Sequence, residues 1–377
     1  MAKSISILLL IFVSIGYCQE KPFKMTYDLG KGEPRMTFGT GKFRSASISL
    51  GDVDGDQDID AVVANGRHWP EKNAVYFNQN SRFTSFSHVG EVHSTTYGLE
   101  LADMDNDGDL DLVEINDMAP HRLYLNDGNG FFQFHATISA PSSARNVVLA
   151  DLDNNQLMDI IICNRGQRNT ICYNEGDLKF NCEDLKTTKN ATIDIEVDDL
   201  NDDGLPDLVL ANRDRILNSI FLNKGNRNFE HDLDFGSGTF ETRSIEIADM
   251  NNDGRADIVT GNINGKNSIY LGSEDSKYMS KLSFGADNED TYAIAVADFD
   301  KDGYLDIGAG NYQQPNAVFL NQKGKSFKRI DLLNDVYKTY DVKVEDLNSD
   351  GWIDIAFANS DDFNLYMINN LMSKTKE

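Results

Sequence analysis

The sequence predicts an all-β fold made of repeated units, and three observations lead to this prediction. A nine-residue segment that begins and ends with aspartate, here called the aspartate loop, occurs seven times at intervals of 48 to 51 residues. The loops open at Asp52, Asp103, Asp151, Asp199, Asp249, Asp298 and Asp346. Short apolar segments typical of strands flank each loop, and no stretch of helical length carries a 3.6-residue apolar period. Each unit of such an array buries its apolar surface against its neighbours.

Two strands are expected around each aspartate loop. The residues two and four positions before the opening aspartate are apolar, as at Ile48 and Leu50, and this alternation indicates a strand with one packed face. After the loop, an unbroken apolar run such as 160–163 indicates a strand buried on both faces. This second strand ends at an asparagine, a favoured turn residue, in every copy. The asparagines are Asn65, Asn116, Asn164, Asn212, Asn262, Asn311 and Asn359.

Two further strands complete the unit. A third strand is expected at segments such as 317–320, and a fourth begins at an aromatic residue such as Phe83 or Phe229. Four short strands per repeat describe one blade of a β-propeller, so seven copies predict a seven-bladed propeller. The last copy lacks a fourth strand, whereas residues 36–38 precede Asp52 at the interval that separates 233–235 from Asp249. We expect this N-terminal segment to complete the last blade and close the ring.

The N-terminal segment of the chain indicates secretion. Lys3, an apolar run over 5–13 and small residues near Gly16 have the order of a secretory signal peptide, which is too short to span a bilayer. We expect a signal peptide at 1–18, a lead-in at 19–33, the propeller at 34–370 and a tail at 371–377. In an alternative reading Cys18 is acylated and anchors the protein. We expect an extracellular or periplasmic monomer with no membrane span.

The net charge of −26 has a local cause. The aspartate loops hold 27 of the 61 acidic residues, which leaves 34 acids against 33 bases in the rest of the chain. Seven bound Ca²⁺ ions would add 14 positive charges and still leave about −12, so we expect no nucleic-acid partner.

The aspartate loops predict calcium sites. Oxygen-bearing side chains occupy positions 1, 3, 5 and 9, a glycine that permits a sharp turn usually occupies position 6, and a backbone carbonyl at position 7 would complete the shell. An EF-hand would need a glutamate at position 12 and flanking helices, but only the second loop has this glutamate, Glu114, and the flanking segments are strand-like. The expected ligands are Asp52, Asp54, Asp56, Asp58 and Asp60 in the first loop; Asp103, Asp105, Asp107, Asp109 and Asp111 in the second; Asp151, Asp153, Asn155 and Asp159 in the third; Asp199, Asn201, Asp203, Leu205 and Asp207 in the fourth; Asp249, Asn251, Asp253, Arg255 and Asp257 in the fifth; Asp298, Asp300, Asp302, Tyr304 and Asp306 in the sixth; and Asp346, Asn348, Asp350, Trp352 and Asp354 in the seventh.

The loops differ in expected affinity. The second and sixth loops keep four aspartates and the glycine, so they are expected to bind Ca²⁺ best. The third loop, with Asn155 and Gln156, is expected to bind worst, and the first has Gln57 in place of glycine. Because protein oxygens fill such sites, a structural role is favoured over a catalytic one.

These residues carry a family resemblance. The unit that joins Phe-Gly, the aspartate loop and a Tyr-Leu-Asn turn resembles the FG-GAP and VCBS-type repeats of integrin α-subunit heads and many secreted bacterial proteins. Phe38-Gly39, Phe235-Gly236 and Phe284-Gly285 are the Phe-Gly halves, and the resemblance covers about 35–370. It implies a seven-bladed propeller with Ca²⁺ in the turns between first and second strands. It says little about biological role, because a fold hosts many functions.

The face opposite the aspartate loops is the expected ligand site. First strands run toward the aspartate loops, so their beginnings share the opposite face with the turns after the second strands. The residues collected there are Arg67, His68, Trp69, Tyr97, His121, Arg145, Arg165, Arg168, Arg213, Arg215, Arg243, Tyr292, Tyr312 and Tyr340. Aromatic and arginine side chains suit sugars or anionic ligands. Alternatively, these polar turns only meet water, with Arg165 or Arg213 paired to Asp214 or a neighbouring turn.

Three functional hypotheses follow. The first is a secreted, calcium-stiffened module that recognises a glycan or a protein, as in cell adhesion. The second is a polysaccharide lyase in which Tyr97, Tyr292, Tyr340, His68 or His121 abstracts a proton beside arginines. The third is a scaffold within a larger assembly. We favour the binding module.

The cysteines of the mature chain predict one disulfide. In a secreted chain Cys163 is expected to pair with Cys172 across a hairpin, which leaves Cys182 as a free thiol.

Overall fold

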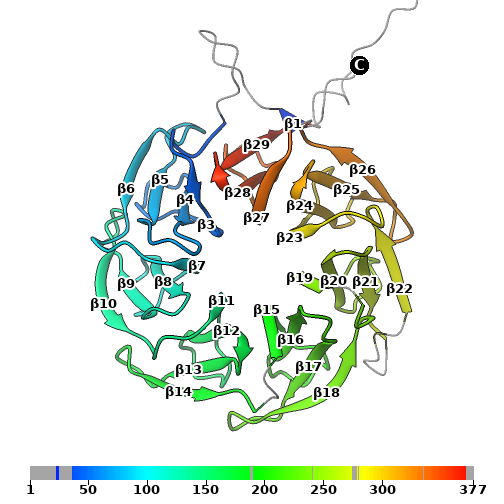
Figure 1. Ribbon diagram of the computed structural model, residues 1–377, viewed down its shortest axis with the longest axis horizontal. Helices are drawn as coiled ribbons and strands as arrows, with labels where there is room; N and C mark the ends of the chain where they lie inside the picture. The colour runs from blue at the N-terminus through cyan, green and yellow to red at the C-terminus, as the bar shows by residue number, and fades with distance from the viewer. Residues whose placement is uncertain are drawn as a thin grey trace, which may run out of the picture.

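The computed structural model describes residues 23–24, 36–186, 190–239, 241–273, 278, 280–333 and 335–370. The predicted signal peptide, Cys18, most of the lead-in and the tail lie outside these residues. All regular secondary structure in the described part is β, and the strands form a ring of radial sheets around a central axis (Figure 1). The prediction of an all-β propeller is confirmed.

The sheets are antiparallel, and the first strand of each repeat lies nearest this axis (Figure 1). The strands are β3 (Ser47–Gly51), β4 (Asp60–Ala64), β5 (Ala74–Phe77) and β6 (Ser85–His88); β7 (Thr96–Ala102), β8 (Asp111–Asn116), β9 (Arg122–Leu125) and β10 (Gln133–Thr137); β11 (Ala144–Ala150), β12 (Asp159–Gln167), β13 (Thr170–Asn174) and β14 (Phe180–Asp184); β15 (Asn190–Asp198), β16 (Asp207–Asn212), β17 (Asn218–Asn223) and β18 (Phe229–Phe235); β19 (Glu241–Ala248), β20 (Asp257–Ile263), β21 (Asn267–Leu271) and β22 (Ser280–Phe284); β23 (Thr291–Ala297), β24 (Asp306–Gln314), β25 (Ala317–Asn321) and β26 (Phe327–Asp331); β27 (Tyr337–Glu345), β28 (Asp354–Asp362) and β29 (Leu365–Asn369). Hydrogen bonding joins the described strands into five sheets, three of four strands, one of eight and one of nine.

The ring closes through the N-terminal segment, as predicted. The inner strands β3, β7, β11, β15, β19, β23 and β27 contact one another in order, and β27 contacts β3. Thr37 bridges Leu365 of β29, and the amide of Phe38 donates to the carbonyl of Asn364 at 3.0 Å. Two short strands near the start of the described chain add to this closure: β1 (Phe23–Lys24) pairs with β29, and β2 (Phe43–Arg44) pairs with β28. The closed ring leaves no open sheet edge between the first and last blades.

The apolar core lies between neighbouring sheets. The second strands β4 and β8 are buried along their whole length, which explains their unbroken apolar runs. One buried cluster joins Val62 of β4 to Leu99 and Leu112 of the next sheet. Each blade therefore contributes to two cores, and the core follows the ring.

A belt of buried hydrogen bonds, here called the asparagine belt, also joins the blades. Asn267 Nδ2 donates to Thr291 Oγ1 at 2.9 Å, and the Thr291 hydroxyl donates to Asn311 Oδ1 at 2.8 Å in the next blade. The same connection recurs in the triplets Asn73, Thr96, Asn116; Asn169, Thr192, Asn212; Asn218, Thr242, Asn262; Asn316, Thr339, Asn359; and, across the ring closure, Asn364, Ser45, Asn65. The asparagines that end the second strands therefore link blades as well as cap turns.

The predicted cysteine pairing is wrong. Cys172 is bonded to Cys182, and Cys163 is a buried free thiol whose pKa is raised by burial. The register explains the difference, because Cys172 on β13 lies directly opposite Cys182 on β14, whereas its partner on β12 is Ile160.

No helix in the described part of the chain is long and apolar enough to cross a membrane.

Candidate functional site

The aspartate loops share one backbone conformation. Position 6 has positive φ in every loop, whether the residue is glycine, as at Gly108 (99°), or glutamine, as at Gln57 (72°) and Gln156 (68°). Position 4 is also left-handed in each copy, for example at Lys301 (58°). The first carboxylate holds this turn: Asp103 accepts the amides of Asp107 and Gly108 at 3.1 and 3.0 Å. The glutamines therefore do not prevent the turn, although a side chain at positive φ carries some strain.

Several loops bring carboxylates together as a cation site would require. In four loops, three carboxylates each offer an oxygen within 4.8 Å of the others: Asp52, Asp54 and Asp60; Asp103, Asp105 and Asp111; Asp151, Asp153 and Asp159; and Asp298, Asp300 and Asp302. Burial and then the charge of Asp107 raise the pKa of Asp105, and Asp300 responds in the same way to burial and Asp302. A bound cation would relieve this repulsion.

Unsatisfied oxygens at position 3 fit a cation as well. Asp153 Oδ1, Asn201 Oδ1 and Asn251 Oδ1 are buried and accept no hydrogen bond. Buried acceptors without a donor are rare in proteins, and ligation would satisfy them. The third loop, expected to bind worst, also has this geometry, but the other oxygen of Asp153 accepts a 2.7 Å bond from Arg227.

The aspartate at position 9 has a second task. Asp111 is buried and accepts the amides of Met104 at 3.0 Å and Asn126 at 2.9 Å, so it ties the loop to the end of β9. Burial raises its pKa to about 6. Equivalent bonds form at Asp60, Asp159, Asp207, Asp257, Asp306 and Asp354.

On the opposite face, β-bulges direct side chains toward the channel. Near the start of six inner strands the pairing register skips one residue, and a bulge of this kind re-aims a side chain. The skipped residues are Tyr97, Arg145, Ile193, Arg243, Tyr292 and Tyr340. All six lie at the position six residues before an opening aspartate, which the sequence had marked at five of them.

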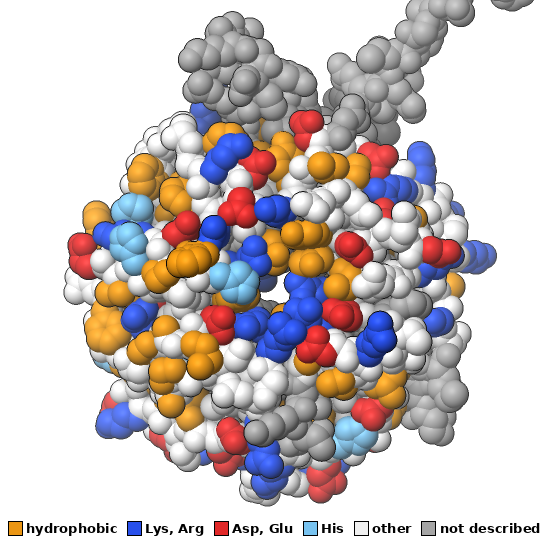
Figure 2. All heavy atoms as spheres, viewed as in Figure 1, with side chains coloured by type: hydrophobic (Ala, Val, Ile, Leu, Met, Phe, Trp, Pro, Cys, Tyr) orange, Lys and Arg blue, Asp and Glu red, His pale blue; other side chains and the backbone are white. Residues whose placement is uncertain are grey.

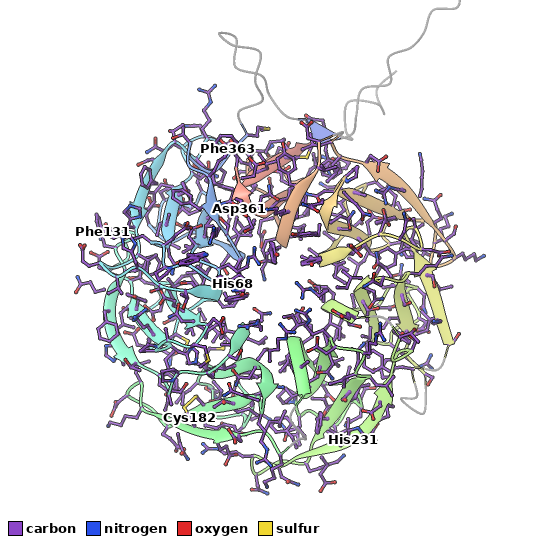
Figure 3. The ribbon with its side chains drawn as sticks, viewed as in Figure 1. His68, Phe131, Cys182, His231, Asp361 and Phe363 are labelled. Carbon is purple, nitrogen blue, oxygen red and sulfur yellow. A yellow bond between two sulfur atoms is a disulfide. The ribbon has the colours of Figure 1, made fainter. Side chains whose placement is uncertain are left out.

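These residues line a cavity of about 550 Å³ that follows the channel. Figure 2 shows lysine and arginine side chains bordering a central opening, and Figure 3 places His68 at the inner edge of the ring, far from Phe131 and His231 at its outer edge. Nine of the fourteen predicted ligand residues line the cavity, namely Arg67, His68, Tyr97, Arg145, Arg165, Arg213, Arg243, Tyr292 and Tyr340. We call this end of the channel the mouth.

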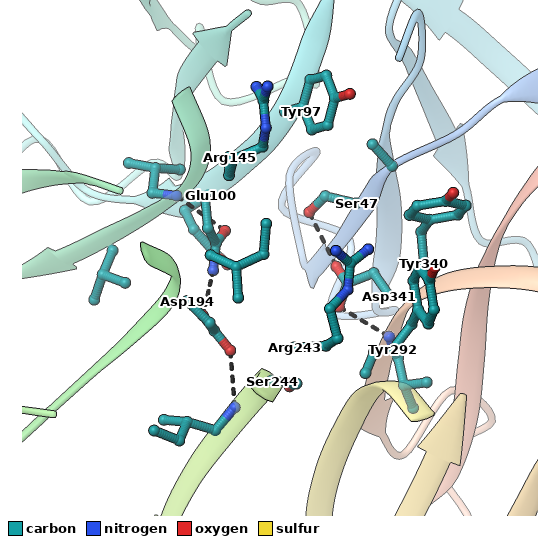
Figure 4. A pocket seen from close by; sticks show the side chains of 18 of the residues that line it. Ser47, Tyr97, Glu100, Arg145, Asp194, Arg243, Ser244, Tyr292, Tyr340 and Asp341 are labelled. Atoms are coloured by element: carbon teal, nitrogen blue, oxygen red, sulfur yellow. Dashed lines mark hydrogen bonds between the residues drawn. The ribbon is translucent and has the colours of Figure 1, made fainter. Parts of the chain in front are cut away.

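Arginines at the mouth are stacked on tyrosines. Arg145 lies 4.4 Å from the ring centre of Tyr97, Arg243 lies 4.0 Å from that of Tyr292, and the two pairs face each other across the cavity (Figure 4). Arg67 lies 4.0 Å from the ring centre of Tyr340. Stacking fixes the guanidinium planes, so the mouth presents preorganised cations.

Five predicted ligand residues do not line the cavity. Trp69, Arg168 and Arg215 are exposed on the turns, and Tyr312 stacks on Tyr292 at 4.8 Å. His121 is fully buried and belongs to the asparagine belt, so its assignment to the ligand face is wrong. Its Nδ1 accepts the amide of Asn116 at 3.1 Å, its Nε2 lies 3.0 Å from Ser142 Oγ, and burial lowers its pKa to about 4. It replaces the asparagine that other blades carry at this position.

The alternative prediction, that arginines of these turns pair with acidic residues of the same or a neighbouring turn, is correct for two arginines. Arg165 lies 3.3 Å from Asp214, and Arg213 lies 3.6 Å from Asp214 and 3.2 Å from Glu241.

Sequence reasoning missed an acidic segment deeper in the channel. Its side chains come from inner-strand positions beyond the bulges: Glu100, Asp194, Glu196, Glu246, Asp341 and Lys343. Lys343 pairs with Glu100 at 3.1 Å. Asp194 and Asp341, labelled in Figure 4, accept amides of neighbouring inner strands at 3.0 Å. Burial raises the pKa of Glu246 to about 8 and that of Glu196 well above its usual value. Only the closure of the ring brings these positions together, so no local motif reveals them.

The fold and this site define the class of protein: a repeat-built β-propeller with acidic metal-type loops on one face and a cavity opening on the other. The family model for FG-GAP-like repeats matches residues 52–114, 103–162, 199–260 and 249–309. The chain belongs to this FG-GAP-like repeat family.

Solved structures support the fold. The BP39L lectin from Burkholderia pseudomallei superposes with a TM-score of 0.66 at 8% identity, covering 87% of this chain and 97% of the lectin. BBS1N, crystallised in complex with ARL6DN, gives a TM-score of 0.59 at 9% identity over 93% of this chain and 97% of that chain. Raptor from Chaetomium thermophilum gives 0.60 at 11% identity over 92% of this chain but 29% of its own. No curated protein matches the sequence.

Proposed function

We propose that this protein is a secreted, calcium-stiffened propeller that recognises an extracellular glycan or protein through the mouth of its channel. The observation that carries the proposal is the set of preorganised arginines around a cavity of about 550 Å³, a size typical of small-molecule sites. Among the similar folds, one is a lectin and another is described in complex with a partner protein, so both kinds of ligand have precedent in this architecture.

Calcium takes the structural part in this proposal. The clustered carboxylates and the unsatisfied oxygens of Asn201 and Asn251 would hold it, and Ca²⁺ prefers such oxygen ligands. A bound ion neutralises the loop and stiffens the turn. The mouth lies at the other end of the inner strands, so the ions act on it only by fixing the blades.

A glycan array probed with the mature protein in calcium, and again in chelator, tests the proposal. We expect one glycan class to bind in calcium and to be lost or weakened in chelator. If no glycan binds in either buffer, a glycan ligand is excluded, and a protein ligand or a scaffold role remains.

One observation favours a lyase as the second candidate. The Tyr97 hydroxyl lies 3.0 Å from ring nitrogens of His68, with Arg145 stacked on the same tyrosine. Burial lowers the pKa of His68, so the ring is neutral and able to accept a proton, and the arginine would neutralise a uronate carboxylate. Incubation with uronate polysaccharides tests this candidate: a lyase releases unsaturated ends that absorb in the ultraviolet, and a constant absorbance rules it out for those substrates.

A further inference from the structure

Arg243 stands out among the arginines of the mouth. It is half-buried, it stacks on Tyr292, and it forms no ion pair or hydrogen bond within the described residues. Burial and the nearby charge of Arg213 lower its pKa, but a guanidinium remains charged at neutral pH. A desolvated charge without a partner is unfavourable, so a negatively charged ligand group would stabilise this site.

Arg67 shares this property. Its Nη2 donates to Ser360 Oγ at 3.2 Å and its Nη1 contacts His68 at 3.3 Å, but its buried Nε has no hydrogen-bond partner and no carboxylate pairs with it in the described part of the chain. By contrast, Arg145 pairs with Asp117 at 2.9 Å. The mouth therefore contains arginines already neutralised by the protein and two that are not.

The two uncompensated arginines lie on neighbouring aromatic rings. Arg67 stacks on Tyr340 and Arg243 on Tyr292, and the centres of these two rings are 5.2 Å apart. Tyr312 covers Tyr292 at an interplanar angle of 19°. Since arginine and Tyr312 occupy the Tyr292 ring, it serves to hold Arg243 rather than to stack on a ligand. Guanidinium groups without a carboxylate partner suit an anionic ligand, and a planar carboxylate matches their hydrogen-bond geometry.

Deeper in the channel the chemistry changes. Glu246 lies three residues beyond Arg243 on β19, roughly 10 Å along the strand, and Glu196 lies on the neighbouring β15. Neither carboxyl group forms a hydrogen bond within the described residues. Burial favours their protonated forms, which both donate and accept hydrogen bonds, as sugar hydroxyl groups also do. Asp194 and Asp341 directly follow the bulge residues Ile193 and Tyr340, so their carboxylates lie nearer the mouth than Glu196 and Glu246. A second anionic group on the ligand would meet these carboxylates, which disfavours a polyanion in the channel.

We propose that the mouth binds the terminal unit of an acidic saccharide, with its carboxylate between Arg67 and Arg243 and its hydroxyl groups toward Glu196 and Glu246. This inference rests on the proposed recognition function and narrows its ligand to a sugar with one anionic group at the chain end. A free inorganic anion shares part of this chemistry, so it must be tested separately.

Calorimetric titration of the mature protein in calcium tests the inference, with D-glucuronate as the probe, D-glucose as the uncharged match and sulfate as the simple anion. We expect glucuronate to bind at least tenfold more tightly than either. R243Q should weaken glucuronate binding at least tenfold, and R67Q should do the same as a second, independent variant. R168Q is the matched control, because Arg168 is exposed on the same face outside the cavity; its affinity should equal that of the wild type.

Four results would overturn the inference: no glucuronate binding, equal binding of glucose, sulfate binding as tight as that of glucuronate, or wild-type affinity in both R243Q and R67Q. The melting temperature of each variant separates loss of the site from loss of the fold. Calcium-dependent binding of uncharged glycans on the array, together with any of these results, would leave the proposed function standing and reject only the acidic ligand.

Discussion

The two faces of the ring use the repeat in opposite ways. On one face the aspartate loops keep the same left-handed positions, even where Gln57 or Lys301 must adopt positive φ. On the other face the bulge recurs in six of the described inner strands, yet its residue is tyrosine, arginine or isoleucine according to the blade. The repeated side chains of the aspartate loops therefore maintain the fold. The side chain at the bulge position changes from blade to blade, and this variation determines which groups line the mouth. The comparison predicts that changes at the first face alter stability and that changes at the second alter binding.

Removal of calcium should have the largest effect. A ligand at 1,000 times its Kd stabilises the native state by about 4 kcal/mol per site, so loss of several ions should lower Tm by at least roughly 10 °C. Scanning calorimetry in CaCl₂ and in EDTA measures the shift. D105A in the second loop, which removes the side-chain oxygen at position 3, is expected to remove about one equivalent of bound calcium. An unchanged Tm in EDTA would mean that the loops are stable without metal. It would contradict the assignment of stability to the face that carries the aspartate loops.

Acid should weaken the blade contact that contains His121. Its pKa is lowered to about 4 in the folded state from 6.5, so below pH 6.5 the unfolded chain binds a proton that the native histidine does not. The contribution of His121 to stability should therefore be constant above pH 6.5 and fall by up to about 3 kcal/mol as the pH drops to 4.

H121N is the matched variant for this prediction, because asparagine fills the same place in the other links of the belt. Urea unfolding at pH 7, 5.5 and 4.5 should show a smaller loss for H121N than for the wild type, while the carboxyl groups of the loops affect both equally. Identical losses would show that His121 does not control this pH dependence.

Breaking the asparagine belt should cost about 1–3 kcal/mol at each link, because a buried amide loses its acceptor. Asn267 Oδ1 accepts the amide of Asn262 at 2.8 Å, and Asn364 Oδ1 accepts that of Asn359 at 2.7 Å. N267A and N364A should therefore be destabilised equally in urea, although only the second lies at the closure; exposed N288A should change stability by less than about 0.5 kcal/mol. A much larger loss for N364A would show that the closure is the weakest contact of the ring.

Loss of Arg243 should have the smallest effect on stability. R243Q removes a partly desolvated charge without a carboxylate partner and one cation–π contact, so the free energy of unfolding should change by no more than about 0.5 kcal/mol. Urea unfolding with R168Q as reference measures this difference. A loss of 2 kcal/mol or more would assign Arg243 to the structural part of the molecule and contradict the division between the two faces.

Much of the architecture was predictable because its determinants are local and repeated. The interval of the aspartate loops, the apolar alternation at Ile48 and Leu50 and the missing last strand lead to the propeller and its closure. The mouth was predictable in part, since Tyr97 and Arg243 share a place in the repeat. The disulfide was not, because Cys163 and Cys182 lie at similar distances in sequence from Cys172 and only strand register selects between them. His121 was misplaced because a buried and an exposed histidine look alike in a sequence.

The sequence by itself determined the repeat, the strand order and the acidic loops, because these depend on side chains within a few residues of one another. Only the tertiary structure decided which arginines carry a partner, that Glu196 and Glu246 share the channel with Arg243, and that His121 joins two blades. Those relations connect residues from different blades, and they exist only once the ring has closed and placed the inner strands around one axis.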